Sequence, residues 1–449
     1  MSDARVQSDR LWGAQTELAQ RNFPIANRPL DARVAHALAA IKRHAAAVNA
    51  SIGVGDVDDE LAATIGDAAA RVERGELDDH FPVDVYQTGS GTSTNMNVNE
   101  VLAALVGRVL DDRIVHPNDH INASQSSNDT VPTAIRLAVA RLLASQVHPA
   151  VASLAAAFRV LADRFRNVVK AGRTHLMDAT PVTVGQEAAA WAGLLERALA
   201  RSHADLQALG ELPLGGTAVG TGINAPEGFA SAVIARLAEE TGLPLRPADD
   251  PMVHMGGQGA LAEASAGMRG IAIALTKIAN DIRLLASGPS CGLAELLLPE
   301  LQAGSSIMPG KVNPVLCESV NQVAARVFGN DATVAYAASQ GILELNTYLP
   351  VMAEALLQSG ELLANVCRTF EEKCVVGIEV DEERCRWYAE RTSALATALN
   401  TVIGYAKAAE LVHTAVEQRR SIVDVVVEAG VLDRAEAERI LDPLPMTGQ

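Results

Sequence analysis

Residues 147–168 read VHPAVASLAAAFRVLADRFRNV, and this stretch decides the fold class of the chain. Its large apolar side chains alternate at spacings of four and three residues: Val147, Val151, Leu154, Phe158, Leu161, Phe165 and Val168. A heptad pattern sustained over three heptads predicts a helix that needs partner helices along its length. Extended outward, the pattern predicts one helix over residues 133–170, kinked near His148 because Pro149 interrupts the backbone hydrogen bonds.

The composition also favours an all-α fold. Of the 449 residues, 49% are hydrophobic but only 3% are aromatic, so the helices must pack closely through small side chains such as alanine. No segment between residues 133 and 373 shows a strand pattern. The formal net charge is −17, from 37 Lys and Arg against 54 Asp and Glu, which argues against nucleic acid as a partner.

Cysteine usage and hydropathy indicate a cytoplasmic protein without a membrane span. The chain has five cysteines, none in a CxxC pair or at a spacing typical of zinc or iron–sulfur sites: Cys291, Cys317, Cys367, Cys374 and Cys385. Residues 1–10 carry charges and no apolar core, so we expect no signal peptide. The most apolar window, residues 267–287, contains four charged residues and is expected to be a buried helix. No motif requires a metal or an organic cofactor, and we expect neither.

Residues 304–314 read GSSIMPGKVNP and interrupt the helical pattern. Glycines at both ends allow backbone conformations closed to other residues, so we expect a mobile loop. Its hydroxyls, free backbone N–H groups, lysine and asparagine could bind a carboxylate and stabilise a developing oxyanion. Taken alone, however, the stretch is better explained as an ordinary connector containing glycine and proline.

Two further polar stretches leave similar alternatives open. Residues 88–100 read TGSGTSTNMNVNE and precede or open a helix, which is the geometry of an anion site but equally of a solvated helix cap. Residues 172–181 read GRTHLMDATP and contain His175. A lone histidine in such a context is most often structural.

Residues 116–129 read HPNDHINASQSSND. His116 and His120 are four residues apart, but the intervening proline disfavours a helical metal-binding pair. Asn128 or Asp129 could cap the helix that follows. Residues 214–222 read LGGTAVGTG, which looks phosphate-binding but lacks a following Lys-Ser/Thr and a preceding strand, so we interpret it as a tight functional turn between two helices.

Four separated motifs, residues 88–100, 116–129, 172–181 and 304–314, resemble signature segments of the aspartase/fumarase superfamily. They are most similar to the class II, iron-independent fumarate hydratases. The similarity also covers residues 11–16, LWGAQT, and residues 345–350, LNTYLP. The resemblance implies a mainly helical, three-domain fold, which we divide into residues 1–123, 124–382 and 383–449. It further implies a homotetramer in which long central helices form a twenty-helix core and segments of three subunits build each active site.

The reaction that the resemblance implies is an anti-elimination from a substituted succinate to give fumarate, in the first instance from L-malate with loss of water. Removing a proton beside a carboxylate builds a doubly charged aci-carboxylate, which a cation and fixed donors would stabilise. By resemblance, Ser305 is the base, with Ser306 as the fallback if the register of the loop is misjudged. His175, oriented by Glu318, would handle the leaving hydroxyl or its water.

The resemblance also assigns the binding residues. Eight positions match the family's substrate-binding donors: Ser90, Thr92, Ser126, Ser127, Asn128, Thr174, Lys311 and Asn313. Four positions resemble a second dicarboxylate site near the entrance: Arg113, His116, Asn118 and Asp119. A small dicarboxylate is therefore the expected ligand, and neither nucleic acid nor a membrane is an expected partner.

The leaving group is harder to predict. Ser90, Ser127 and Gly310 are fumarase-like where aspartases usually carry Ala, Thr and Ala, but residues 299–303, PELQA, look like an aspartase. Residues 248–258, ADDPMVHMGGQ, depart from the family's Asn-x-x-Glu-Ala pattern. A carbon–nitrogen lyase, acting on aspartate or on a specialised substrate such as nitrosuccinate, is thus the alternative. An inactive structural relative is a second alternative, disfavoured because the expected catalytic residues are all retained.

Overall fold

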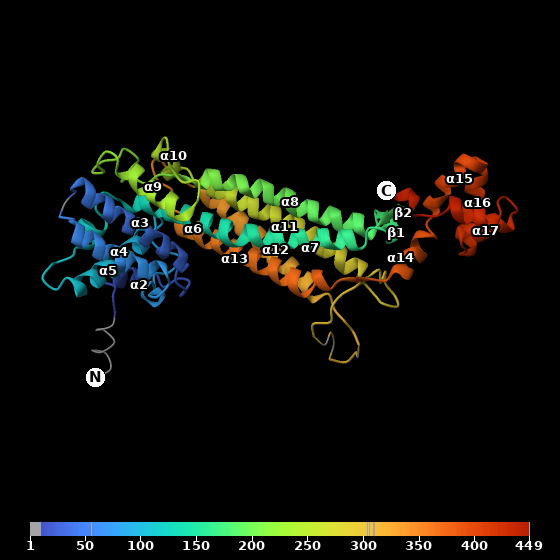
Figure 1. Ribbon diagram of the computed structural model, residues 1–449. Coiled ribbons are helices and arrows are strands. Elements are labelled where there is room, and N and C mark those ends of the chain that lie inside the picture. Colours follow the sequence, from blue (N-terminus) through green and yellow to red (C-terminus); the bar gives the residue numbers. More distant parts are fainter. Residues whose placement is uncertain (1–9, 55, 303, 305, 309, 449) are drawn as a thin grey trace. The chain divides into compact units, whose positions relative to one another are not determined.

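The computed structural model describes residues 10–54, 56–302, 304, 306–308 and 310–448. These residues fold mainly into α-helices (Figure 1) and form two compact units. The first unit comprises residues 1–149, 198–272 and 323–364, and the second comprises residues 150–197, 273–322 and 365–449. The predicted all-α fold is confirmed, whereas the three-domain division predicted above stays a prediction.

The first unit contains the N-terminal helices and two short ones from the middle of the chain. These are α2 (Ala14–Asn22), α3 (Ala32–Ile52), α4 (Asp59–Glu73), α5 (Thr92–Val109), α6 (Ser127–Leu142), α9 (Phe229–Thr241) and α10 (Pro251–Gly256). The parallel pair β3 (Glu211–Leu212) and β4 (Arg246–Pro247) also belongs to it. Four long helices have stretches in both units: α8 (Val184–Leu209), α11 (Gly259–Leu285), α12 (Val315–Ala338) and α13 (Leu349–Lys373).

The second unit contains α7 (His148–Arg164) apart from its first two residues, and the C-terminal helices. The latter are α14 (Glu382–Ala389), α15 (Ala396–Ile403), α16 (Tyr405–Gln418), α17 (Ile422–Glu428) and α18 (Arg434–Ile440). Its strands form two antiparallel pairs, β1 (Val169–Thr174) with β2 (Met177–Thr183) and β5 (Leu296–Leu297) with β6 (Glu379–Val380).

The heptad stretch forms a helical run that is irregular where proline predicted it. A π-helical turn, Leu143–Val147, separates α6 from α7. Pro149 has no N–H to donate to the carbonyl group of Ser145, so the backbone must adapt just before His148. The run over residues 127–164 is long and apolar enough to cross a membrane by length and composition alone. However, 61% of the residues in its most apolar window are buried inside the structure, so the apolar side chains of this run belong to the protein's own core.

The prediction that residues 133–373 contain no strand is wrong, and the predicted helix ends six residues too late. Beyond Arg164, the carbonyl groups of Phe165 and Val168 accept hydrogen bonds from Gly185 N and Val184 N at 3.0 and 2.9 Å. The chain then runs into β1, which pairs with β2 from Val169↔Thr183 to Thr174↔Met177. The heptad spacing extends past the end of the helix because Phe165 is buried although it lies outside α7.

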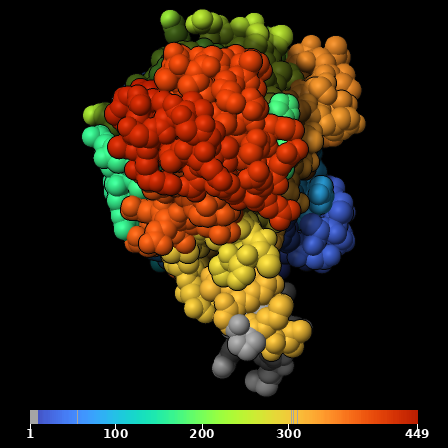
Figure 2. All heavy atoms as spheres, turned by 90° about the vertical axis from the view of Figure 1, so that its right-hand side faces the viewer, coloured from blue at the N-terminus to red at the C-terminus, as the bar shows by residue number. Residues whose placement is uncertain are grey.

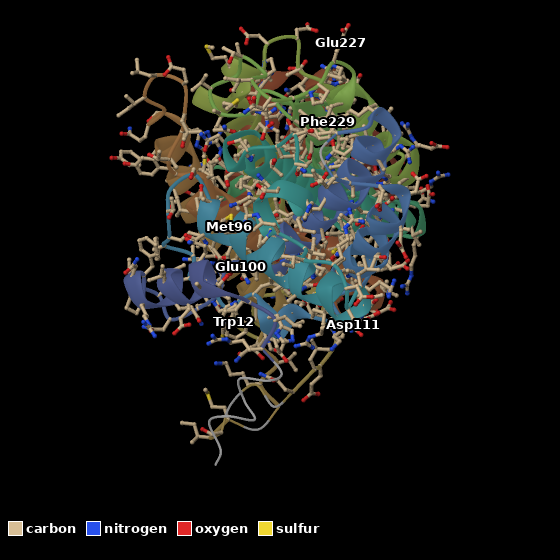
Figure 3. The ribbon with its side chains drawn as sticks, turned by 90° about the vertical axis from the view of Figure 1, so that its left-hand side faces the viewer. Trp12, Met96, Glu100, Asp111, Glu227 and Phe229 are labelled. Atoms are coloured by element: carbon tan, nitrogen blue, oxygen red, sulfur yellow. The ribbon has the colours of Figure 1, made fainter. Side chains whose placement is uncertain are left out.

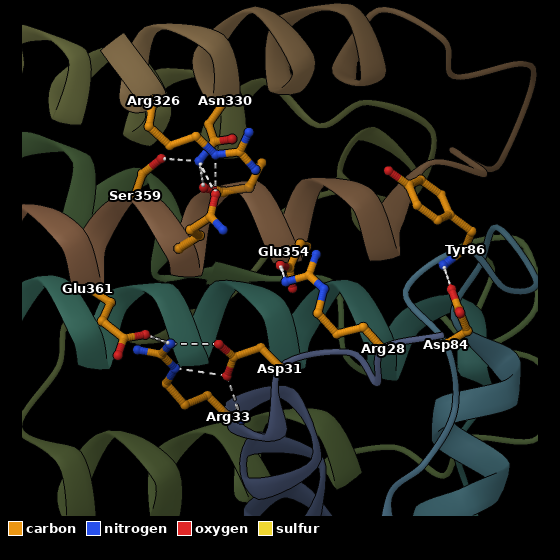
Figure 4. Close-up of polar contacts among 12 residues, drawn as sticks. Arg28, Asp31, Arg33, Asp84, Tyr86, Arg326, Asn330, Glu354, Ser359 and Glu361 are labelled. Carbon is orange, nitrogen blue, oxygen red and sulfur yellow. Dashed lines mark hydrogen bonds and ion pairs between the residues drawn. The ribbon is translucent and has the colours of Figure 1, made fainter. Parts of the chain in front are cut away.

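Ion pairs and buried amides hold α3 and α12 to α13 in the first unit (Figure 4). Arg33 donates to Asp31, next to it at the start of α3, at 2.6 Å and to Glu361 on α13 at 2.7 Å. Asn330 on α12 donates to Ser359 Oγ on α13 at 3.0 Å. Because Asn330 and Ser359 are both buried, this bond fixes the register of the two helices.

Three aromatic rings pack together in the second unit's bundle. The ring of Phe158 on α7 lies 5.7 Å from Trp191 on α8 and 6.5 Å from Phe370 on α13, and Trp191 Nε1 donates to Asp281 on α11 at 2.9 Å. The C-terminal helices pack around a separate apolar cluster that includes Leu399, Leu411 and Val426. Figure 2 shows these helices as one closely packed group of side chains.

Candidate active site

The predicted binding residues 126–128 open helix α6. Ser126 is the N-cap, and its Oγ accepts a hydrogen bond from Asn128 N at 3.2 Å. Asp129 Oδ1 in turn accepts from Ser126 N at 2.9 Å, so serine and aspartate form a capping box. The expectation that Asn128 or Asp129 would be the cap is therefore wrong, because Asp129 occupies the third helical position. The cap fixes three consecutive polar residues at a helix N-terminus.

Asp129 also joins this helix start to residues 214–222. Its Oδ2 accepts hydrogen bonds from Gly215 N and Thr217 N, each at 2.9 Å. Asn128 Nδ2 donates to Ala218 O at 2.9 Å. Burial raises the pKa of Asp129, while its backbone donors oppose that shift. Residues 214–222 thus form an irregular turn between β3 and α9 that is bound to the start of α6.

Residues 88–100 place a second helix N-terminus beside the first. Helix α5 begins at Thr92 after Gly91, which has φ 73°. A side chain at Gly91 would clash with Val131 of α6, since an added Cβ would lie 2.6 Å from Val131 Cγ1. Ser90 Oγ lies 2.8 Å from Thr92 Oγ1.

A direct contact joins the two helix starts, because Asn95 Nδ2 on α5 donates to Ser127 Oγ on α6 at 2.9 Å. The predicted binding residues Ser90, Thr92, Ser126, Ser127 and Asn128 therefore lie on two helix starts that touch. Free N–H groups and helix dipoles make such a place suited to an anion.

Glu100, the last residue of the stretch over residues 88–100, accepts hydrogen bonds from the N-terminal segment. Its carboxylate accepts from Gly13 N at 3.0 Å, Gln15 N at 2.8 Å and Thr16 Oγ1 at 2.7 Å. Figure 3 shows Glu100 on α5 near Trp12. Residues 11–16 are thereby attached to α5, which explains why a motif so far from the other polar stretches belongs to the same unit.

Sequence reasoning missed Lys42, a fully buried lysine beneath the site. Its Nζ donates to Asn122 Oδ1 at 2.6 Å and to Gln125 Oε1 at 3.0 Å. Burial lowers the pKa of Lys42 to about 7, although the nearby charge of Asp129 opposes this shift. A lysine inside residues 36–48, HALAAIKRHAAAV, was the available signal, since most of its neighbours on that helix face are apolar.

The four residues predicted for a second site do not share one cavity. Arg113 donates to Asp58 Oδ2 at 2.7 Å and lines a cavity of about 490 Å³ with His120. Asn118 and Asp119 line another cavity, also of about 490 Å³.

His116 caps the turn that carries this pair, because its Nδ1 accepts from Asn118 N and Asp119 N at 3.3 and 3.2 Å. No group of three metal-ligating side chains stands ready for an ion among the residues that the structure describes.

In the second unit, Thr174 and His175 lie at the tip of the β1–β2 hairpin. His175 and Leu176 both have positive φ, 57° and 61°, as the two central residues of a tight hairpin turn require. His175 is exposed, as are Leu176 and Met177 beside it, which are 74% and 69% accessible. The hairpin therefore presents the histidine at its outermost point.

A buried ion network anchors this hairpin. Glu295 is fully buried and pairs with Lys170 Nζ and Arg173 Nη2 of β1, each at 2.8 Å. Lys170 also pairs with Glu187 of α8 at 2.7 Å. The hairpin is thus fixed to the segment just before β5, which leads into residues 304–314.

Residues 304–314 are described in part. Ser305, the predicted base, lies outside the described residues. Asn313 Nδ2 donates to Gly304 O at 2.6 Å, which closes the loop on itself. A Cβ at Gly304 would lie only 1.9 Å from Lys311 O, so glycine is required there. Lys311 and Asn313 line a cavity of about 370 Å³ with Ala294 and residues 296–298.

The remaining two predicted residues are exposed. Ser306 lies in the loop and Glu318 lies in the first turn of α12. No hydrogen bond or ion pair joins Glu318 to His175 within the described part of the chain, so the orienting contact stays a prediction. The predicted site residues are thus divided between the two units, with the starts of α5 and α6 in the first, and the hairpin tip and the loop before α12 in the second.

Comparisons with known proteins identify the family. The family model described as "Lyase" matches residues 3–329, and that described as "Fumarase C C-terminus" matches residues 395–448. Class II fumarate hydratase of Mycobacterium tuberculosis is 47% identical over 451 residues, covering 99% of this chain and 94% of its own length. That of Halobacterium salinarum is 48% identical over 451 residues, covering 100% of this chain and 96% of its own. The chain belongs to the class II fumarate hydratase family.

Solved structures agree with this assignment. Class II fumarase from Schistosoma mansoni matches with a TM-score of 0.93 at 37% identity over 98% of this chain and 96% of that one. A cobalt-bound protein from Brucella melitensis, described as fumarate lyase:delta crystallin, matches with a TM-score of 0.93 at 42% identity over the same shares. The resemblance predicted from the four motifs is therefore confirmed.

Residues 248–258, which lack the Asn-x-x-Glu-Ala pattern expected from the resemblance, contact β3 and α6. In residues 248–258, His254 Nδ1 faces Arg136 Nη2 at 3.1 Å and His254 Nε2 faces Glu211 Oε2 at 3.1 Å. Burial and the neighbouring guanidinium lower the pKa of His254. The segment also packs on the turn over residues 214–222, because a Cβ at Gly220 would meet Met252 at 2.8 Å. The segment therefore packs against the turn that Asp129 binds to the start of α6.

Proposed function

We propose that this chain is a fumarate hydratase that interconverts L-malate with fumarate and water by anti-elimination. The observation that carries the proposal is the match to class II fumarate hydratases at 47% identity over 99% of the chain. The geometry supports it, because two touching helix starts offer several hydroxyl and backbone donors to an anion. Such donors are needed in a protein whose net charge is −17.

The chemistry assigns a role to each group. Ser305 removes the proton on the carbon next to one carboxylate, and Ser306 is its substitute if the register differs. Lys311 and Asn313 stabilise the aci-carboxylate that forms, because its second negative charge develops only on the way to the transition state. His175 transfers a proton to the leaving hydroxyl, directly or through a water molecule, so that the hydroxyl departs as water. Ser90, Thr92, Ser126, Ser127, Asn128 and Thr174 hold the substrate, and Arg113, His116, Asn118 and Asp119 contribute to a second dicarboxylate site.

The active form is a cytoplasmic homotetramer with a twenty-helix core, in which three subunits contribute to each site. The exposed tip of the hairpin supports this, since Leu176 and Met177 leave apolar surface beside His175 that another subunit would cover. The partners are small dicarboxylates, with no nucleic acid and no membrane.

A carbon–nitrogen lyase is the second candidate, and one observation favours it. The unusual segment over residues 248–258 packs on the turn beside the site, so it could reshape the space around the leaving group. Aspartate and nitrosuccinate are the candidate substrates. An inactive structural relative is less well supported, because Lys311, Asn313, His175 and Glu318 are all present.

The test is the ultraviolet absorbance of fumarate when purified protein meets L-malate, L-aspartate or nitrosuccinate in separate cuvettes. We expect fumarate from malate alone, and no turnover by Ser305→Ala, whose oligomeric state should match the wild type. Fumarate from aspartate or nitrosuccinate alone would establish the carbon–nitrogen lyase instead. No fumarate from any of the three substrates would support the inactive relative. Undiminished turnover by Ser305→Ala would refute the assignment of Ser305 as the base.

A further inference from the structure

Thr217 is a buried threonine that does nothing for the fold through its hydroxyl. It is 4% exposed, and its Oγ1 has no hydrogen-bond partner among the residues that the structure describes. Its φ is 55°, a conformation that a β-branched residue rarely adopts. A buried hydroxyl without a partner and a strained backbone both lower stability, and such features gather where they serve binding or catalysis.

The position of Thr217 is fixed relative to the predicted substrate-binding residues. Its own N–H donates to Asp129 Oδ2 at 2.9 Å, and the other carboxylate oxygen of Asp129 accepts from Ser126 N at 2.9 Å. The next residue, Ala218, accepts from Asn128 Nδ2 through its carbonyl oxygen. One buried carboxylate and one amide thus hold the turn over residues 214–222 against the start of α6.

Thr217 and Ser126, the N-cap of α6, line the same cavity. The cavity measures about 490 Å³, and its polar wall includes Asn118, Asn122, Gln125, Ser126, Thr217 and Asn224. Amide and hydroxyl groups dominate that wall, and Asp119 is its one acidic residue among those described. Donors of this kind suit a ligand that carries carboxylates but do not hold it as tightly as a cation would.

We infer that Thr217 is a further substrate-contacting residue, whose hydroxyl donates a hydrogen bond to a carboxylate of the dicarboxylate bound at Ser126–Asn128. The inference rests on the proposed function. A threonine hydroxyl rotates freely about its C–O bond, so it can turn its hydrogen toward a ligand that enters the cavity. Because the backbone N–H of Thr217 is hydrogen-bonded to Asp129, the Thr217 side chain is held in place before the substrate binds. This lowers the conformational entropy lost on binding.

The test compares Thr217→Val with Thr217→Ser and with a matched control in the same turn, Thr221→Val, whose side chain is exposed and outside the cavity. Valine keeps the shape and the strain but removes the hydroxyl. We expect kcat/KM for both L-malate and fumarate to fall about 10- to 100-fold, as when a hydrogen bond to a charged group is lost. The thermal midpoint should stay level or rise, because an unpaired buried hydroxyl has gone. Thr217→Ser should restore most of the activity, and Thr221→Val should match the wild type.

Three outcomes would overturn the inference. The first is an unchanged kcat/KM in Thr217→Val. The second is a loss of activity that parallels a fall in the thermal midpoint. The third is a loss of activity with malate alone, which would place the contact on the leaving hydroxyl. If the wild type itself fails to turn over malate and fumarate, the proposed function falls first. Calorimetric binding of fumarate and of L-aspartate to the wild type and Thr217→Val then decides the point. Weaker binding by the variant supports the carboxylate contact, and equal binding or none by the wild type refutes it.

Discussion

Lys42 binds the segment just before the start of α6, although it touches none of the predicted binding positions. It donates to the side-chain oxygens of Asn122 and Gln125, and Asn122 Oδ1 also accepts from Asn95 on α5 at 3.2 Å. A single buried ammonium thus organises the amides just before Ser126. Burying it lowers its pKa to about 7, which is a measurable consequence.

Lys42→Met should change how stability depends on pH. The pKa of Lys42 is about 7 in the fold and near 10.4 in the unfolded chain, so the unfolded state binds more protons between those values. The wild type should therefore gain stability relative to Lys42→Met as pH rises from about 7 to 10, by up to about 1.4 kcal/mol per pH unit. Urea unfolding of both proteins across this range measures the difference. If the free energies of unfolding of the two proteins varied with pH in parallel, the lowered pKa of Lys42 would be contradicted.

Single residues divide into those that sequence could identify and those that it could not. The predicted polar motifs contained residues that the structure brings together at the starts of α5 and α6, because helix caps have local signatures. The cap itself was misplaced by two or three residues, since Ser, Asn and Asp all cap helices well. Asp129, Thr217 and Lys42 gain their importance from contacts with distant segments, which no local pattern contains.

Among the elements, the β1–β2 hairpin is the clearest case of tertiary structure overriding a periodic pattern. Its residues were predicted partly as helix and partly as an interruption, yet they form a ladder ending in a tight turn at His175. Glu295 explains how this short element stays fixed, because it binds both cations of β1 from a segment more than a hundred residues away. Most of the helical run over residues 127–164, by contrast, was predicted, since its apolar period is strong.

Glu295→Gln should loosen the hairpin. The change leaves Lys170 and Arg173 without one charged partner in a buried place, and breaking a buried ion pair in this way costs about 3–5 kcal/mol of stability. Malate turnover should fall as well, because His175 loses its fixed position. Chemical denaturation measures the first effect and an absorbance assay the second.

The matched control is Glu196→Gln, which removes the partner of Arg159 from an exposed ion pair in the same unit. It should lower stability by less than about 1 kcal/mol. If both substitutions had equal effects, the buried network would not be what holds the hairpin.

At the scale of the whole molecule, composition and motifs predicted the all-α fold and the family, and the family and structural matches confirm both. They could not predict the division of the chain into two units, because this depends on which stretches of the long helices contact one another. The division matters for function, since Ser127 belongs to one unit and His175 to the other. The assembly of the site from different subunits is therefore the central claim to test.

The most direct measurement mixes two inactive variants, Ser127→Ala and His175→Asn, which damage one group of site residues each. Each variant alone should turn over L-malate far more slowly than the wild type. After joint unfolding and reassembly, some sites would receive an intact Ser127 from one subunit and an intact His175 from another, so we predict that part of the activity returns. If mixed oligomers form but stay as inactive as the separate variants, each site lies within a single chain and the account is contradicted.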